Sequence, residues 1–386
     1  MFVSHLGLVD FRSYESVEVD LTAGATTLVG ANGQGKTNLV EAIGYAATLR
    51  SHRVATDAPL VRRGAQRAIV RVHARRDGRE VVLELEIAPG RGSRARVNRS
   101  PVPKRRDLLG HLSRVLFCPE DLALVKGDPS DRRGYLDELL VGLAPRFDAV
   151  LADLDRVLRQ RNSLLKSAGA LRGGGARSRA AAEQTIAVWD DQLAALSADL
   201  ITARARLVDQ LAGPVAQRYR SVAPAPEDPG VELSYACGVP GVGQGQSRPE
   251  VAELVREALA ARREEEFARG LTLSGPHRDE LALALHGMPL RGYASHGESW
   301  SMALALRLAS FDLLRSEAAR GGDPVLILDD VFAELDQERR ARLAGVVADV
   351  EQVLITAAVP EDVPGALTGR TIPITAGRVG AAGAAP

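Results

Sequence analysis

GANGQGKT, from Gly30 to Thr37, directly follows the expected strand Ala25–Val29. It fits the pattern GxxxxGK[ST], whose glycines let the backbone turn with its N–H groups pointing at a phosphate. The lysine is placed to reach the β- and γ-phosphates of a nucleotide, and the threonine to offer its hydroxyl to magnesium. The residues expected to cradle the phosphates are Gly30, Ala31, Asn32, Gly33, Gln34, Gly35, Lys36 and Thr37.

The flanking residues supply the strand and the helix that such a loop requires. Apolar residues recur at helical spacing from Leu39 to Ala47, so residues 37–49 are expected to form an amphipathic helix against a sheet. Lysine is scarce, at four of the 49 basic residues, which makes a lysine at this position hard to attribute to chance. A plain glycine-rich turn is the alternative, and the order strand, loop, helix argues against it.

A second motif is the apolar run Val325–Leu328, which ends in Asp329 and Asp330. A buried strand that ends in two acids is typical of a Walker B element. Asp329 would hold magnesium, and Asp330 would orient or deprotonate the attacking water. Slow hydrolysis is expected, because aspartate is one methylene shorter than the glutamate of fast ATPases. A strand that ends in a helix-capping acid pair is the alternative.

Residues 293–299, YASHGES, precede a helix-favouring segment that runs to Leu314. Ser295 and Gly297 resemble the signature motif of the ABC ATPase class, which reaches across to the nucleotide held by a second subunit. His296 and Glu298 depart from that motif, and the glutamate would repel a phosphate. A plain capped core helix is the alternative here.

Two later positions follow Asp329 in the order of that class. Asp336, in AELD, resembles the D-loop, and Thr356 stands where many relatives carry a histidine switch residue. Neither stretch would be notable alone, but their order and spacing place both residues at the nucleotide.

Length and patterning predict how the chain is divided. Single cores stop growing near about 250–300 residues, so 386 residues predict at least two domains. Hairpin-forming strands dominate the first part, including the pair joined at Asp77-Gly78, whereas the middle of the chain is rich in Ala, Leu and Arg and favours helices. The expected class is α/β: an ABC-type P-loop ATPase head, with mixed and antiparallel sheets and flanking helices, split by an inserted α-helical lobe. The expected parts are residues 1–124 and 269–379 for the head, 125–268 for the helical lobe and 380–386 for a disordered tail, with a loop at 171–179 and a linker at 224–249.

Composition excludes several classes of protein. No apolar run approaches the roughly 20 residues that a membrane span needs, and Met1–Leu8 lacks the features of an export signal, so a cytoplasmic protein without a membrane partner is expected. Cys118 and Cys237 are isolated in sequence, which argues against a disulfide or a metal cluster. The net charge is +0, so a nucleic-acid surface would have to come from local clustering of basic residues.

One such cluster spans residues 91–106, with seven basic residues and no acid. Backbone phosphates of duplex DNA are its natural partner, because few aromatic residues accompany the charges. A solvated hairpin in an arginine-rich chain is the alternative. The candidate DNA-binding residues are Arg91, Arg94, Arg96, Arg99, Lys104, Arg105 and Arg106.

Several blocks together resemble the RecF family over nearly the whole chain. They are DFRSYE at 10–15, VGANGQGKTNLVEAI at 29–43, LRSHR at 49–53, LFCPEDLALVKGDPSDRRGYLDELL at 116–140, LSGPHRDEL at 273–281 and LILDDVFAELDQERR at 326–340. The blocks at 116–140 and 273–281 are more specific to the family than any Walker motif.

The resemblance implies an SMC- or Rad50-like head that binds ATP and Mg²⁺ and dimerises on DNA when ATP is bound. It implies a slow, DNA-stimulated ATPase used as a switch in recombinational gap repair and fork maintenance, on double-stranded, gapped or junction DNA. The implied partners are RecR and RecO, and indirectly RecA. Arg12 would touch the nucleotide phosphates, and Asp330 would be the catalytic residue. His277, Arg278 and Asp279 match a family motif and are expected to brace the second lobe.

Two other classes share part of this pattern. A transporter-type ATPase subunit has the same loop, Walker B element and signature, but it would lack DNA-facing arginines in an insertion. A chromosome-organising head of the SMC type would carry much longer helical arms than residues 131–210 provide. The family's magnesium-monitoring glutamine also has no counterpart, because Val115 and Leu116 stand at that stretch.

Overall fold

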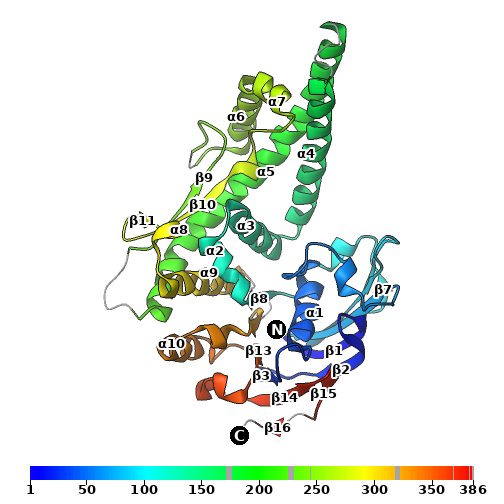
Figure 1. Cartoon of the computed structure of the whole chain (residues 1–386), viewed down its shortest axis with the longest axis vertical. Coiled ribbons are helices and arrows are strands. Elements are labelled where there is room, and N and C mark those ends of the chain that lie inside the picture. Colours follow the sequence, from blue (N-terminus) through cyan, green and yellow to red (C-terminus); the bar gives the residue numbers. More distant parts are fainter. Residues whose placement is uncertain are drawn as a thin grey trace. The chain divides into compact units, whose positions relative to one another are not determined.

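The computed structural model describes residues 1–170, 176–224, 230–243, 245–317, 322–367, 369–381 and 383–384. The chain divides into two compact units. Unit 1 comprises Met1–Val125, Pro214–Pro229 and Ala294–Pro386, and unit 2 comprises Lys126–Gly213 and Gly230–Tyr293. Figure 1 shows that unit 1 holds two sheets and unit 2 is mainly helical. A mixed α/β architecture with an inserted helical part, as expected, is thus confirmed.

The first sheet of unit 1 is antiparallel, in the order β2-β1-β4-β5-β6-β7. Its strands alternate buried and exposed residues, as β4 does with Ala68, Val70 and Val72 buried, so one face packs on the core. Asp77 and Gly78 have positive φ and form the expected hairpin turn. The strands are β1 (Phe2–Phe11), β2 (Tyr14–Asp20), β4 (Ala68–Arg76), β5 (Arg79–Ile87), β6 (Arg94–Val97) and β7 (Ser100–Pro101).

The second sheet of unit 1 has the order β15-β14-β3-β13-β12-β8, and β16 pairs with β14. Strands β14, β3, β13, β12 and β8 are parallel neighbours. Every residue of β12 and β13 is buried, which agrees with the apolar residues that make up most of both strands. The strands are β3 (Gly24–Val29), β8 (Arg114–Phe117), β12 (Val325–Asp329), β13 (Gln352–Ala357), β14 (Arg370–Thr375), β15 (Arg378–Val379) and β16 (Gly383–Ala384).

Helix α1 (Lys36–Thr48) joins the two sheets of unit 1. It contacts β1, β4 and β5 of the first sheet and β8, β12 and β13 of the second, so its residues are buried from Leu39 to Ala47. The other helices of this unit are α9 (His296–Glu317) and α10 (Gln337–Val347), with the short α2 (Ala123–Lys126) at its boundary. Single 3₁₀ turns lie at Ala58–Leu60, Arg105–Leu108, Pro119–Leu122, Val331–Glu334, Pro360–Asp362 and Gly365–Leu367.

Unit 2 packs its helices around a buried ionic cluster. Arg161 is fully buried and donates to Asp190, Glu266 and Thr272. A buried cation needs such partners, because an unpaired charge would be strongly destabilising. The helices are α3 (Pro129–Leu143), α4 (Arg146–Ala170), α5 (Ala176–Val222, with Pro214 at the unit boundary), α6 (Arg248–Ala261), α7 (Arg263–Arg269) and α8 (Leu290–Tyr293), with the 3₁₀ turn Pro276–Arg278 and strands β9 (Glu232–Ala236), β10 (Glu280–Leu285) and β11 (Met288–Pro289).

Three expectations about organisation differ from the structure. The expected linker at 224–249 contains β9, which pairs with β10, and this pairing places residues 269–293 in unit 2 instead of the head. The expected disordered tail includes β16, whose Gly383 and Ala384 pair with Thr371 and Arg370. In the expected loop at 171–179, residues 171–175 lie outside the described residues, and α5 begins at Ala176.

Candidate nucleotide-binding site

The glycine loop links the central strand β3 to α1, as the order of elements in the sequence predicts. Gly33 and Gly35 have φ of 82° and 109°, a region that favours glycine. A Cβ on Gly30 would lie 2.2 Å from the Ile374 carbonyl oxygen, and one on Gly35 would lie 2.7 Å from the Tyr14 hydroxyl. The loop therefore has its tight shape because glycines stand at these positions.

Lys36 is folded over this loop and is only 3% exposed. Its Nζ atom donates to the carbonyl oxygens of Gly30 at 2.7 Å and Ala31 at 3.4 Å, and to Oδ1 of Asn32 at 3.5 Å. A buried ammonium beside backbone N–H groups at a helix N-terminus is the arrangement that binds phosphate oxygens.

Residues near the C-terminal end of the chain contact the glycine loop. The Gln34 side chain accepts a hydrogen bond from the Ala376 N–H, and its carbonyl oxygen accepts one from Gly377 at 3.1 Å. The Tyr14 hydroxyl donates to the Gly35 carbonyl at 3.1 Å. Burial raises the pKa of Tyr14 to about 12, so this phenol stays a neutral donor at physiological pH.

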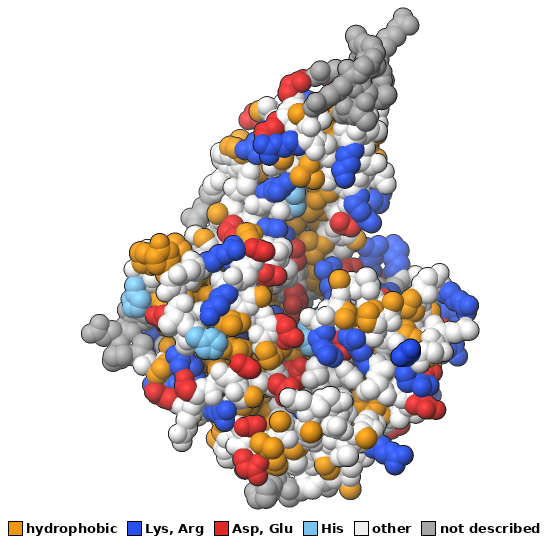
Figure 2. Space-filling model, in the orientation of Figure 1, with side chains coloured by type: hydrophobic (Ala, Val, Ile, Leu, Met, Phe, Trp, Pro, Cys, Tyr) orange, Lys and Arg blue, Asp and Glu red, His pale blue; other side chains and the backbone are white. Residues whose placement is uncertain are grey.

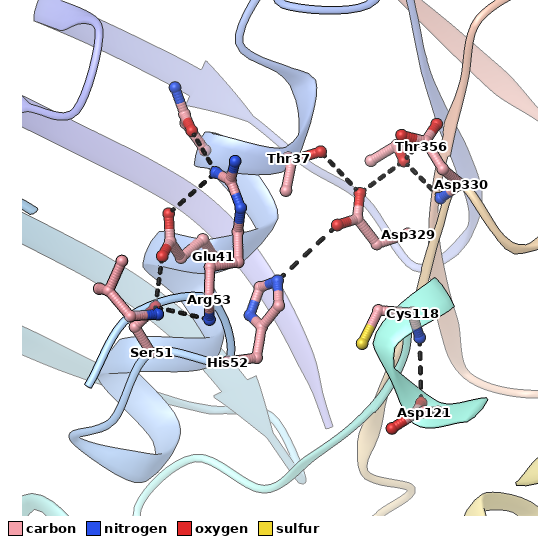
Figure 3. A network of polar contacts seen from close by, with 12 residues as sticks. Thr37, Glu41, Ser51, His52, Arg53, Cys118, Asp121, Asp329, Asp330 and Thr356 are labelled. Carbon is pink, nitrogen blue, oxygen red and sulfur yellow. Dashed lines mark hydrogen bonds and ion pairs between the residues drawn. The ribbon is translucent and has the colours of Figure 1, made fainter. Parts of the chain in front are cut away.

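Asp329 lies at the carboxyl end of β12, within hydrogen-bond distance of Thr37 at the end of the glycine motif. Its Oδ1 atom accepts hydrogen bonds from the hydroxyls of Thr37, at 3.0 Å, and Thr356, at 2.7 Å. Thr356 is the register partner of Asp329 on the neighbouring strand β13. Figure 3 shows the three side chains converging from α1, β12 and β13. A carboxylate and hydroxyl oxygens are suitable ligands for Mg²⁺, so the residues present fit this ion.

Asp330 follows with φ of 52°, an uncommon conformation for a residue with a side chain. Its N–H donates to the Thr356 hydroxyl at 2.9 Å, and the same hydroxyl lies 3.3 Å from its Oδ1 atom. Burial and the neighbouring Asp329 raise the pKa of its carboxyl, while Lys36 opposes this shift. A strained backbone and a raised carboxyl pKa are features of functional sites.

The signature-like segment forms a capping box at the start of α9. The Ser295 hydroxyl accepts from the Glu298 N–H at 3.2 Å, and the Glu298 carboxylate accepts from the Ser295 N–H at 2.8 Å. Trp300 Nε1 donates to His296 Nε2 at 3.1 Å. The two residues that depart from the ABC pattern thus stabilise the helix start, and Ser295 remains exposed.

Asp336 caps the next helix, α10, by accepting from the Arg339 N–H at 2.9 Å. This bond is the largest cause that lowers the pKa of Asp336. Arg339 also donates to the Ser301 hydroxyl at 3.0 Å, and a Cβ on Gly297 would lie 2.6 Å from its guanidinium. One arginine therefore connects the two segments that the sequence assigns to the signature and the D-loop.

Arg12 is held by a carboxylate in this structure. Its guanidinium donates twice to Glu41, which is fully buried on α1, and once to the Pro59 carbonyl at 3.1 Å. Glu41 also accepts from the Ser51 hydroxyl and lies 3.6 Å from the Arg53 guanidinium. Arg12 thus stands next to the loop's helix, but its charge is already engaged.

Two features of unit 1 carry no signal in the sequence alone. His52 lies 3.8 Å from Oδ2 of Asp329. Arg307 of α9 donates to Oδ1 of Asp121, and the Cys118 N–H donates to the other oxygen at 3.0 Å. Both pairs join segments distant in sequence, so no local pattern predicts that these side chains meet. Burial, with the nearby Asp121 carboxylate, raises the pKa of the Cys118 thiol.

The basic stretch lies on β6, β7 and the turns around them. Arg91, Arg94, Arg96, Arg99 and Lys104 are exposed. Figure 2 shows basic side chains on the part of unit 1 where Figure 1 places β7.

Arg105 differs from its neighbours in this stretch. Its guanidinium pairs with Asp57 at 2.7 Å and donates to the Tyr45 hydroxyl at 2.8 Å. Arg106 is partly buried. The DNA-facing candidates are therefore the exposed members of the stretch, since Arg105 is engaged within the unit.

The SGPHRD motif lies inside unit 2. Asp279 is buried and accepts from the Tyr235 hydroxyl and from the Gly238 N–H at 2.8 Å. Arg204 of α5 donates to the Pro276 carbonyl at 2.7 Å and lies 3.6 Å from Asp279. These contacts brace β10 against α5 and β9, which supports a structural role for the motif. Burial lowers the pKa of His277 to about 4, so its ring is neutral at pH 7.

None of the helices in the described residues is long and apolar enough to cross a membrane.

Comparison with known proteins covers nearly the whole chain. Residues 2–372 match the family model described as RecF/RecN/SMC N terminal domain. The chain is 57% identical to the DNA replication and repair protein RecF of Frankia alni, over 98% of this chain and 99% of that protein. It is also 57% identical to the protein of that name from Kineococcus radiotolerans, over 96% of each chain.

Solved structures show the same relationship. A structure of the recombination mediator protein RecF with ATP, described as belonging to the RecFOR pathway, matches with a TM-score of 0.87 and 27% identity, over 98% of this chain and 97% of that one. The Smc head domain of Pyrococcus furiosus bound to ScpA matches with a TM-score of 0.54 and 17% identity, over 99% of this chain and 96% of that one. That second likeness concerns the fold alone.

Proposed function

The chain belongs to the RecF family, and from this premise we propose that it is an ATP-dependent DNA-binding protein of recombinational repair. The observation that carries the proposal is the convergence of Lys36, Thr37 and Asp329 at one end of the second sheet. These residues supply a cation for phosphate oxygens and two oxygen ligands for Mg²⁺. The solved RecF relative with ATP supports ATP as the nucleotide.

The phosphates would bind to the backbone N–H groups of residues 30–37 at the start of α1. Lys36 would leave its carbonyl partners and reach the terminal phosphates, while Thr37 and Asp329 hold the magnesium ion. Bound magnesium would neutralise phosphate charge. Arg12 would contact phosphate only if it exchanged Glu41 for the nucleotide, so its role in binding is secondary in this proposal.

ATP would join two copies of the chain. The exposed Ser295 and the partly buried Gly297 lie at the N-terminus of α9, where hydroxyl and backbone groups suit a phosphate presented by a second copy. Asp336 is exposed nearby and is linked to this segment through Arg339. Because ATP would bind the dimer better than the monomer, nucleotide would shift the equilibrium toward the dimer.

Hydrolysis would reset the dimer slowly. Asp330 is the residue placed to accept a proton from the attacking water, and Thr356 orients its backbone and carboxylate. The short aspartate side chain has less reach than a glutamate, which agrees with a switch that turns over slowly.

The partners proposed are DNA, RecR and RecO, and indirectly RecA. The exposed basic residues from Arg91 to Lys104 would contact duplex backbone without reading its sequence. The pathway named for the solved RecF relative includes RecO and RecR, and the identity over whole chains extends that expectation to this protein. Gapped or junction DNA is the substrate class expected for such a mediator.

Sedimentation of the purified protein tests the central step. The protein is expected to be monomeric with ADP and dimeric with ATP and Mg²⁺, and to sediment further with duplex DNA added. The Lys36→Ala variant loses the phosphate contact and should remain monomeric in all three conditions. A wild-type protein that stays monomeric with saturating ATP, Mg²⁺ and DNA would refute the proposal.

A further inference from the structure

His52 is a mostly buried side chain beside Asp329 that has no part in the function proposed above. Its Nε2 atom lies 3.8 Å from Oδ2 of Asp329, and the two side chains are only 11% and 5% exposed. That separation exceeds the roughly 3.2 Å of a direct hydrogen bond. Nε2 is also without a hydrogen-bond partner in the part of the chain that the structure describes. Buried polar atoms are rarely left in this state, so this nitrogen calls for an explanation.

The two oxygens of Asp329 have different surroundings. Oδ1 accepts hydrogen bonds from the hydroxyls of Thr37 and Thr356. Oδ2 is the oxygen that faces His52, as Figure 3 shows. The hydroxyls of Thr37 and Thr356 bind Oδ1 of the carboxylate, and the imidazole of His52 is placed to bind Oδ2.

The loop that carries His52 is braced against the same helix that begins with Lys36. The Ser51 hydroxyl donates to Glu41, which is fully buried on α1. The same hydroxyl accepts from the N–H groups of Arg53 at 3.0 Å and Val54 at 3.2 Å. The hydrogen bonds of Ser51 therefore fix the turn that carries the imidazole of His52.

We propose that His52 is a positioning residue of the nucleotide site, whose Nε2 atom donates a hydrogen bond toward Oδ2 of Asp329, directly or through one water. This inference rests on the proposed function, because Asp329 counts there as the carboxylate that holds Mg²⁺. Mutation of a residue that orients a metal-binding side chain typically lowers metal affinity about 10- to 100-fold. His52 thus acts on magnesium binding and leaves the phosphate loop alone.

The test separates nucleotide binding from magnesium binding in the full chain. A fluorescent ATP analogue is titrated first in EDTA, and then Mg²⁺ is titrated at a fixed concentration of the bound analogue. The His52→Ala variant should bind the analogue in EDTA as the wild type does, but should need about tenfold more Mg²⁺ to reach half of the magnesium-dependent change.

Two amide variants and one control sharpen the test. The His52→Gln side chain can place an N–H near the position of Nε2 and should recover most of the Mg²⁺ affinity, whereas the shorter His52→Asn should behave as the alanine variant does. His111→Ala changes an exposed histidine of unit 1 outside the site and should match the wild type.

Each outcome bears on the inference. A His52→Ala variant with wild-type Mg²⁺ affinity would overturn it. A variant that fails to bind the analogue even in EDTA would also overturn it, because His52 would then support the loop and not the carboxylate. A wild type that binds the analogue without any response to Mg²⁺ would instead overturn the magnesium site of the proposed function.

Discussion

Glu298 combines two effects at one position. It completes the capping box of α9, yet its charge stands at the helix N-terminus where a phosphate is expected. Glu298→Gln keeps the hydrogen-bonding pattern of the box and removes the charge. Charges at helix ends contribute about 0.3–1 kcal/mol, so the ATP concentration for half-maximal dimerisation should fall about two- to fivefold, as measured by sedimentation at several ATP concentrations.

Ser295→Ala is the comparison variant in this experiment, because it keeps the Glu298 charge and removes the cap acceptor. Ser295→Ala loses the cap acceptor as well as the proposed phosphate contact, at a cost of about 1 kcal/mol to the helix start. It should therefore dimerise less well than the wild type. An unchanged or raised ATP requirement in Glu298→Gln would show that the glutamate charge does not oppose nucleotide capture.

Asp330 gives the site a distinctive pH dependence. Its carboxyl pKa is raised above the ordinary aspartate value by burial and by Asp329. If it acts as the base, hydrolysis should decline on the acid side at a pH above that ordinary value, because the protonated form cannot accept a proton. Asp330→Asn should lower the hydrolysis rate about 100-fold or more while ATP-induced dimers persist, measured by phosphate release and sedimentation.

Sequence reasoning at this scale succeeds where the chemistry is local. Lys36 and Thr37 are adjacent in one motif, and Asp329 ends an apolar strand, so short patterns predict that they meet. His52, Glu41 and Arg307 act through partners far away in sequence, and no local pattern predicts those contacts. Arg105 shows the converse: its place in a basic run does not reveal that Asp57 and Tyr45 already engage it.

At the scale of elements, the pair Asp121–Arg307 ties α9 to the loop that follows β8. The side chains are 4% and 12% exposed, so replacing Asp121 removes this ion pair from a largely buried arginine. Asp121→Asn should lower the unfolding free energy by about 3 kcal/mol in urea denaturation.

An exposed ion pair provides the control for this variant. Glu338→Gln removes the partner of Arg342 on the surface of α10 and should cost less than about 0.5 kcal/mol. Equal effects of the two substitutions would mean that the buried pair adds nothing to the attachment of α9.

His277 should make the stability of unit 2 dependent on pH. Its pKa is lowered from 6.5 to about 4 by burial, so the unfolded chain binds more protons between these values. Stability is then complete above pH 6.5 and is lost as the pH falls toward 4, by about 2 kcal/mol between pH 7 and pH 5. Urea denaturation of the full chain at both pH values should show a smaller change for His277→Gln. An identical change in both proteins would exclude this histidine as the source.

Elements with strong local signals were predicted well. The hairpin at Asp77-Gly78 and the buried strand β12 follow from turn chemistry and apolar runs. Strand β9 was missed, because it lies in a Pro/Gly-rich stretch and is stabilised only by its pairing with β10. The strand near the chain's end was missed for the same reason, since glycine and alanine have low strand propensity and β14 supplies the pairing.

For the whole molecule, DNA binding should depend on salt in a way that identifies the contacting arginines. Each phosphate contact adds about 0.9 to the slope of log affinity against log salt. The triple variant Arg94→Gln, Arg96→Gln, Arg99→Gln should reduce that slope by up to about three units, measured by fluorescence anisotropy with duplex DNA at several salt concentrations.

Arg105→Gln is the matched control in the same stretch. Its charge is neutralised by Asp57, so the slope should remain that of the wild type. A slope that falls with Arg105→Gln and not with the triple variant would place the DNA on a different surface.

The position of β3 also bears on how the protein is made on the ribosome. This strand carries the glycine loop near the start of the chain, but its two neighbours in the sheet are Gln352–Ala357 and Arg370–Thr375. During translation the loop therefore lacks its flanking strands until these late segments have been synthesised. A premature stop anywhere before residue 350 would leave this loop without either of the strands that flank β3 in the sheet.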